Sequence, residues 1–156
     1  MSVAYLFVKW LHILSSTLLF GTGIGIAFFM WLAHRRGNVV EIAGTARTVV
    51  VADACFTAPA VVTQLVTGLW LTHRLGIGLS PVWIRATLVL FCLVGACWLP
   101  VLWLQIRARD LAAAAAVNNS SLPASYYRIM RLWFWLGWPA FFGVIVIFWL
   151  MVDKPG

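Results

Sequence analysis

The chain has 156 residues, of which 63% are hydrophobic and only 10% are charged, and its formal net charge is +7. A soluble domain usually has about 25% charged residues, so this chain has too few polar side chains to cover itself in water. The basic residues lie between long apolar runs, as membrane topology requires, and no basic cluster with aromatic residues indicates nucleic-acid binding. The composition therefore predicts a protein that lies almost wholly in a lipid bilayer.

Four apolar stretches are long enough to cross a hydrocarbon core of about 30 Å as helices, which takes roughly 20 residues each. They cover about residues 4–32, 49–71, 82–104 and 132–152. Their apolar runs are continuous and lack the alternation of a membrane β-barrel. The sequence predicts an all-α fold, a single four-helix transmembrane domain over residues 1–156, in the inner (cytoplasmic) membrane.

The first predicted span has a polar face. On a helical wheel at about 100° per residue, this face contains Tyr5, Lys9, His12, Ser16 and Gly23. His12 lies roughly 10 Å inward from the outer end of the helix. Because ionisable groups in contact with lipid are unfavourable, we expect this face to point into the bundle. Two roles are open for His12: a hydrogen bond between helices, or ligation of a haem or metal.

Small residues follow on the same span. Gly21 and Gly25 form a small-xxx-small pair, which predicts close approach of a second helix, with close approach of a flat cofactor as the alternative. His34 lies beside two arginines, and we expect it in a solvated loop.

On the second predicted span, Asp53, Thr57, Gln64 and Thr67 share one face. Asp53 lies near the cytoplasmic end, where pairing with a loop arginine is its expected role. Gln64 lies near mid-membrane and can form a hydrogen bond to another helix. Pro59 predicts a kink, and His73, at the outer end, is expected at the interface.

In the third predicted span, Arg85 lies one turn inside the outer end, at a depth similar to that of Lys9. Both can extend to the interface, and both can hold acidic groups of a ligand. The alanine-rich residues 107–117 are predicted to extend this helix into the cytoplasm. Residues 118–125 then form a turn, with Ser125 as a cap for the fourth helix.

The basic residues are unevenly distributed between the two sides of the predicted bundle. One side has Arg35, Arg36, Arg47, Arg107, Arg109, Arg128 and Arg131, and the other has Lys9, Arg74, Arg85 and Lys154. Because the side richer in Lys and Arg faces the cytoplasm, both termini are predicted on the non-cytoplasmic side.

Four segments suggest a family: KWLHILSSTLLFGTGIGIAFFMW, FTAPAVVTQLVTGLWL, GACWLPVLWLQIRARDL and LGWPAFFGVIVIFWLMVDKP. Together they resemble the integral membrane proteins of the family designated domain of unknown function 2269. The resemblance covers nearly the whole chain. More distantly, the chain is similar to the membrane domain of copper-resistance D proteins and to the bacterial membrane protoporphyrinogen oxidase family, whose members are four-span haem b proteins.

The similarity to the oxidase family implies that His12, in the motif K-x-x-H, is the leading candidate for a haem ligand. The chain also departs from that family. Residues 96–98 (Ala-Cys-Trp) replace a histidine of its third span, Arg85 at best replaces a lysine there, and residues 136–138 (Leu-Gly-Trp) replace a polar, acidic motif. The similarity therefore implies a shared fold without implying the oxidase activity.

The leading hypothesis is a haem b protein with a redox role, in which His12 is an axial ligand to the iron. Lys9 and Arg85 would hold the propionates, and Gln64 is a further cofactor-binding candidate. The second axial ligand and any catalytic residue are not identified, so a haem-dependent membrane oxidoreductase is one option.

Two alternatives stay open. One is a transport or metal-handling protein with a polar path of Lys9, His12, Asp53 and Gln64, and the other is a non-catalytic membrane assembly partner. The partners considered are the lipid bilayer, a second copy of the chain and a membrane redox protein, but no nucleic acid.

Overall fold

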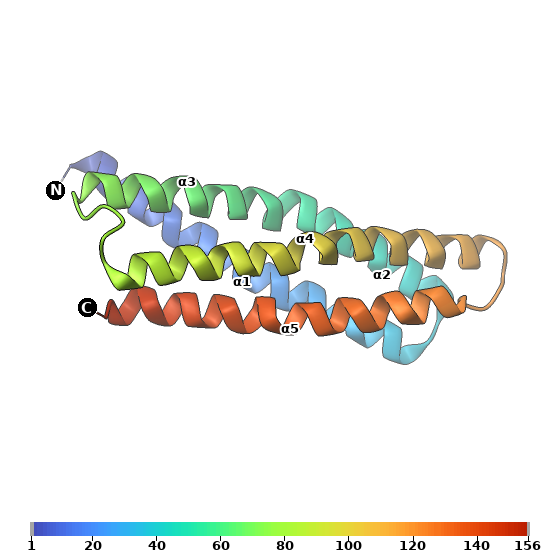
Figure 1. Ribbon diagram of the computed structural model, residues 1–156. Helices are drawn as coiled ribbons and strands as arrows, with labels where there is room; N and C mark the ends of the chain where they lie inside the picture. The colour runs from blue at the N-terminus through green and yellow to red at the C-terminus, as the bar shows by residue number, and fades with distance from the viewer. Residues whose placement is uncertain (1, 156) are drawn as a thin grey trace.

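The computed structural model describes residues 2–155, which form long helices joined by short turns (Figure 1). The elements are α1 (Val3–Arg36), α2 (Val39–Ala52), the π-helix η1 (Asp53–Thr57), α3 (Ala58–Arg74), α4 (Val82–Val117) and α5 (Ala124–Asp153). The elements α2, η1 and α3 follow one another without a break. Within residues 2–155 there is no strand, and four helices are long and apolar enough to span a membrane. The predicted all-α four-helix membrane bundle is therefore confirmed.

The turn between α1 and α2 is shorter than the predicted loop. Gly37 ends α1 with a φ of 73°, a left-handed conformation that glycine adopts without strain. Asn38 follows at once as the N-cap of α2, and its Oδ1 accepts hydrogen bonds from the N–H groups of Val40 and Glu41 at 3.0 and 3.1 Å. Arg47 thus lies within a helix, although the second predicted span was expected to begin only near residue 49.

The turn between α4 and α5 agrees with the prediction in part. The alanine-rich residues 107–117 do continue α4, as expected from their high helix propensity. However, α5 begins at Ala124 with Pro123 in the N-cap position, so Ser125 lies inside the helix and is not its cap.

The helices form two antiparallel pairs that diverge toward one end. Helix α4 packs along α5, and α1 packs along α3, whereas α3 makes no extensive contact with α4 or α5. Both chain ends lie at the end of the bundle where the two pairs are farther apart (Figure 1). We call this the terminal end. At the opposite, arginine-rich end, α2 fits against both α1 and α4 and joins the two pairs.

The buried core occupies the arginine-rich half of the molecule. It is built largely from small side chains and a few long ones, including Met30, Ala33, Ile42, Ala46, Ala108, Ala112, Ala115, Tyr126 and Met130. In α4 these alanines recur every three or four residues, so they form one face of the helix. Their small size lets α2 and α5 approach α4 closely.

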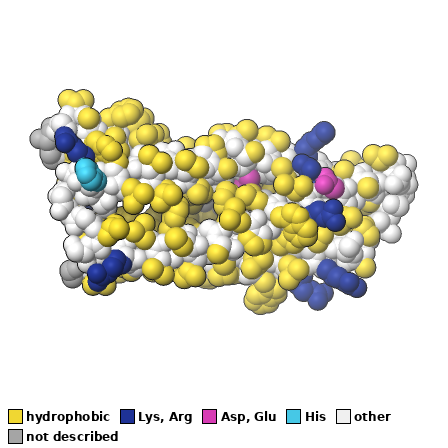
Figure 2. Space-filling model, turned by 45° about the horizontal axis from the view of Figure 1, so that its top comes forward, with side chains coloured by type: hydrophobic (Ala, Val, Ile, Leu, Met, Phe, Trp, Pro, Cys, Tyr) yellow, Lys and Arg dark blue, Asp and Glu magenta, His cyan; other side chains and the backbone are white. Residues whose placement is uncertain are grey.

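Four tryptophans, each beside a basic side chain, mark two levels along the bundle. The pairs are Trp31–Arg35 and Trp103–Arg107 toward the arginine-rich end, and Trp70–Arg74 and Trp83–Lys154 toward the terminal end. Figure 2 shows basic side chains gathered at these ends, with hydrophobic side chains between them. Tryptophan and basic residues favour membrane interfaces.

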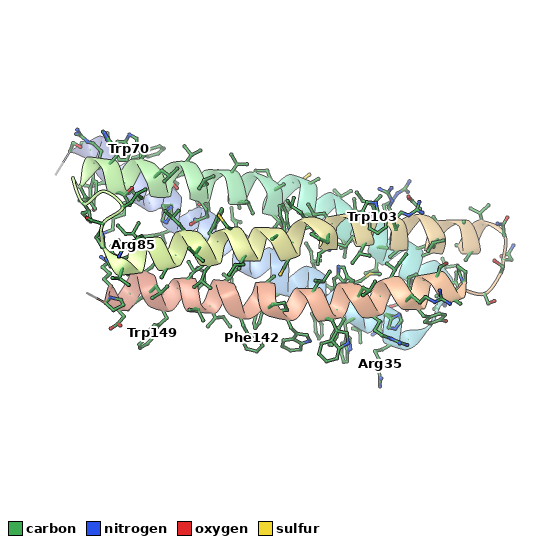
Figure 3. The ribbon with its side chains drawn as sticks, viewed as in Figure 1. Arg35, Trp70, Arg85, Trp103, Phe142 and Trp149 are labelled. Carbon is green, nitrogen blue, oxygen red and sulfur yellow. The ribbon has the colours of Figure 1, made fainter. Side chains whose placement is uncertain are left out.

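The spacing of these levels matches a bilayer. Trp83 and Trp103 lie 20 residues apart on α4, or about 30 Å at 1.5 Å per residue, which is the thickness of a hydrocarbon core. Between the levels, Phe142 and Trp149 of α5 point away from the bundle, as lipid-facing side chains do (Figure 3). Most of the buried core therefore lies beyond the hydrocarbon, at the arginine-rich end.

Candidate functional site

His12 lies in the interface between α1 and α3, where Thr67 holds its ring. His12 Nδ1 is 2.7 Å from Thr67 Oγ1, and the Thr67 hydroxyl donates its own proton to the carbonyl oxygen of Thr63. A hydroxyl has a single proton, so Thr67 Oγ1 must accept the hydrogen bond from His12. The neutral imidazole consequently has its proton on Nδ1 and a free lone pair on Nε2.

The backbone around His12 is fixed to α3 by Gln64. The Gln64 Nε2 donates to the His12 carbonyl oxygen and to Ser15 Oγ, the latter at 2.6 Å. Gly68 makes room for the ring, because a Cβ at that position would lie 3.3 Å from His12 Cε1. The structure thus brings together His12 and Gln64, two of the predicted site residues.

The other two predicted site residues lie apart from these contacts. Lys9 and Arg85 are exposed, and neither side chain forms a hydrogen bond or ion pair with another described residue. Arg85 lies near the start of α4, at the terminal end (Figure 3). Both cations remain free to contact a ligand or lipid headgroups there.

A cavity of about 630 Å³ lies between the α1–α3 pair and the α4–α5 pair. Its walls contain ten aromatic side chains: Phe20, Phe28, Trp31, Phe91, Trp98, Trp133, Phe134, Trp138, Phe141 and Phe148. Figure 2 shows a recess between hydrophobic side chains on this face. His12 is not part of the wall. The wall does contain Ser16, Leu19 and Gly23, which lie further along the same face of α1. The ring of His12 therefore lies about one helical turn outside the cavity.

Four buried polar side chains line the cavity toward the arginine-rich end. We call Asp53, Thr57, Gln105 and Trp133 the Asp53 cluster; their exposed fractions are 4, 5, 5 and 6%. The Asp53 carboxyl lies beside Thr57 and Gln105. Nevertheless, Thr57 Oγ1, Gln105 Oε1 and Trp133 Nε1 have no hydrogen-bond partner among residues 2–155. Such buried groups without a protein partner are rare, so this end of the cavity is unusually polar for its surroundings.

The π-helix η1 supplies half of this cluster. It begins at Asp53 and ends at Thr57, and the N–H of Ala58 donates to the Asp53 carbonyl oxygen, five residues back. Pro59 has no N–H, so the usual hydrogen bond to the carbonyl of Cys55 cannot form, which favours the wider turn. Single π turns of this kind often occur at functional sites.

Several sequence-based expectations outside these sites are corrected. Asp53 does not pair with an arginine, since the ion pairs among the described residues are Arg36–Glu41 and Arg109–Asp110. Gly21 and Gly25 do not mediate close approach, because a Cβ at either position would meet no atom within 4 Å.

His34 is also placed differently from the prediction. It lies in the last turn of α1, not in a loop, and its Nδ1 is 3.3 Å from the Tyr126 hydroxyl. His73 is exposed at the end of α3, where it was expected. Among residues 2–155, no three His, Cys, Asp or Glu side chains gather as a metal site would require.

The family comparison covers all of these features. The model of a family of predicted integral membrane proteins, DUF2269, matches residues 6–155, a range that includes His12, the cavity and the Asp53 cluster. No curated protein matches the chain, and neither does any solved structure. The resemblance found in the sequence is thereby confirmed over nearly the whole chain: the protein belongs to the DUF2269 family of predicted integral membrane proteins.

Proposed function

We propose that the protein binds haem b through His12 and has a redox role in the membrane. The observation that supports this proposal is the hydrogen bond between His12 Nδ1 and Thr67, because it leaves the lone pair of Nε2 free for iron. Histidines that bind metals commonly donate their other N–H to an oxygen atom, which fixes the ring and its tautomer. His12 has such a partner before any ligand is bound.

The surroundings of His12 fit a flat apolar group. Its Nε2 makes no hydrogen bond with another described residue. This atom is also not among the completely buried atoms without a partner, so a ligand can reach it. The face of α1 that carries it leads into the aromatic cavity. Lys9 and Arg85 are the cations available for propionates at the terminal end. Haem would supply one-electron transfer, with a potential set by ligation, hydrogen bonding and burial.

Absorption spectra of the purified protein test this proposal. We expect a Soret band in protein expressed with ample haem and purified gently in a mild detergent, and its loss in His12→Ala. Added imidazole should restore part of the band in that variant. His73→Ala is the matched control, because His73 is exposed and outside the site, and it should keep the full band. Colourless wild-type protein, or an unchanged band in His12→Ala, would contradict haem binding at His12.

A second candidate is transport, which is supported by one specific feature. Ser16 of α1, Gln64 of α3 and Asp53 of η1 all line the cavity. Polar residues at different depths thus border one continuous space. Flux into proteoliposomes should then exceed that of empty vesicles and fall in His12→Ala and Asp53→Asn. Equal flux in protein-containing and empty vesicles would argue against transport.

A further inference from the structure

We propose that the cavity binds lipophilic organic cations, with Asp53 as their counter-ion. The ligand class is an apolar, preferably aromatic, body that has a positive charge and N–H donors. The polar residues of this site do not include His12, and the proposal does not depend on haem binding. Gln64 lies 11 residues from Asp53, about 16 Å along the helix, so the two polar groups occupy different depths.

The charge of the cavity wall points to a cation. Among residues 2–155, Asp53 is the only wall residue of an ionisable acidic or basic type, since none of the described wall residues is Lys, Arg, His or Glu. It is 4% exposed and forms no ion pair with another described residue. A buried carboxylate without an ionic partner is strongly unfavourable, even where hydroxyl and amide groups lie beside it. A bound cation would compensate this charge, whereas an anion would be repelled.

The unpaired atoms of the Asp53 cluster fit an ammonium or aromatic amine. Thr57 Oγ1 and Gln105 Oε1 are unpaired acceptors beside the carboxyl group, and N–H donors of a ligand would satisfy both. The indole N–H of Trp133 is an unpaired donor in the same cavity wall, and it can donate to an acceptor atom of the ligand. Hydrogen-bonding groups and charge are thus gathered at one end of the cavity.

The rest of the wall favours an apolar and aromatic body. Ten of its side chains are aromatic, and aromatic faces attract cations, more strongly where water is excluded. The volume of about 630 Å³ lies within the range of small-molecule sites and is far larger than a metal ion requires. A small inorganic cation would leave most of this space empty.

The packing of the helices indicates how such a ligand reaches Asp53. The packed core closes the arginine-rich end, because Met30, Ala108 and Met130 are buried there. Between α3 and the α4–α5 pair, by contrast, there is no extensive contact. The cavity is therefore accessible from within the membrane, which lipophilic cations enter more readily than hydrophilic ions do.

Binding of one charged and one uncharged aromatic probe to the full chain in a non-ionic detergent tests the proposal. Ethidium is a permanently charged aromatic cation with amino N–H groups, and phenanthridine is its uncharged parent ring. We expect ethidium to bind above the level of empty micelles, and Asp53→Asn to weaken this binding at least tenfold. Phenanthridine binding should change less than twofold in the same variant, because this neutral ring forms no ion pair with Asp53.

Three variants control this experiment. Asp110→Asn removes an exposed, ion-paired carboxylate and should leave ethidium binding unchanged. Asp53→Glu keeps the charge and should retain ethidium binding, while unchanged phenanthridine binding by Asp53→Asn shows that this variant is folded. His12→Ala should also bind ethidium, and Asp53→Asn should keep any Soret band, so failure of one proposal is distinguishable from failure of the other.

Three outcomes would overturn the cation site. The first is ethidium binding by wild-type protein no stronger than by empty micelles. The second is equal ethidium affinity in wild type and Asp53→Asn. The third is displacement of ethidium by sodium chloride but not by choline chloride at equal ionic strength, which would indicate an inorganic cation site instead.

Discussion

Single side chains decide how closely the helices of this bundle approach. At Gly143 of α5, an added Cβ would lie 2.5 Å from Val94 Cγ2 of α4, which is closer than two carbon atoms can pack. At Gly137, six residues earlier on α5 and in the cavity wall, an added Cβ would meet nothing within 4 Å. Two glycines of one helix thus have different roles, and the local sequence alone does not distinguish them.

We predict that Gly143→Ala lowers the free energy of unfolding by roughly 1–3 kcal/mol, because the methyl group forces α4 and α5 apart. Gly137→Ala is the matched control. It should be neutral or stabilising, since alanine favours a helix by about 1 kcal/mol over glycine. Unfolding of both variants by sodium dodecyl sulfate in mixed micelles measures the difference. Equal destabilisation would show that the close contact at Gly143 does not determine stability.

At the same scale, part of the candidate site could be predicted from sequence. The helical wheel placed His12 and Gln64 on inward faces, and the structure joins them. It could not identify Ser15 or Gly68, because their importance depends on the register between α1 and α3. Gln105 and Trp133 were missed for another reason. Each lies within two residues of a predicted span end, where a polar or aromatic residue is ordinarily interfacial.

At the scale of elements, helix lengths were harder to predict than their number. Hydropathy detects only the part of a helix that crosses lipid, so the second span was expected to begin near residue 49, whereas α2 begins at Val39. The missing turns are more polar and lie at the arginine-rich end, where packing on α4 stabilises them. Pro59 predicted a kink, but a π turn cannot be distinguished from a simple bend by sequence.

The alanine face of α4 gives a prediction at this scale. Ala112 is completely buried, whereas the adjacent Ala113 is exposed. Leucine at position 112 should separate α4 from its neighbours and lower the free energy of unfolding by about 1–3 kcal/mol. Ala113→Leu has the same change in side chain and should cost less than about 0.5 kcal/mol. Thermal unfolding in detergent, followed by circular dichroism, distinguishes them; similar midpoints for both variants would contradict tight packing of this face.

At the scale of the whole molecule, the distribution of arginines predicts the orientation in the membrane. Ser2 and Ser80 lie at the terminal end, and Asn118 lies at the arginine-rich end. After Cys55, Cys92 and Cys97 are replaced by serine, a single cysteine is introduced at each position in turn. A membrane-impermeant thiol reagent applied to cells with a permeable outer envelope should label positions 2 and 80. Position 118 should react only after the membrane that contains the protein is opened, and the opposite pattern would show inverted topology.

The two ends of the molecule are stabilised by different forces. Apolar burial is strongly favourable only where water is the alternative, which holds for the arginine-rich core beyond the hydrocarbon. In the spanning half, lipid competes with helix packing, and the pairs diverge. The arginine-rich end therefore joins the two helix pairs, while the gap between α3 and the α4–α5 pair faces the bilayer. A thinner or more fluid membrane would then alter the distance between α3 and α4. The lipids therefore form part of the wall that any ligand meets.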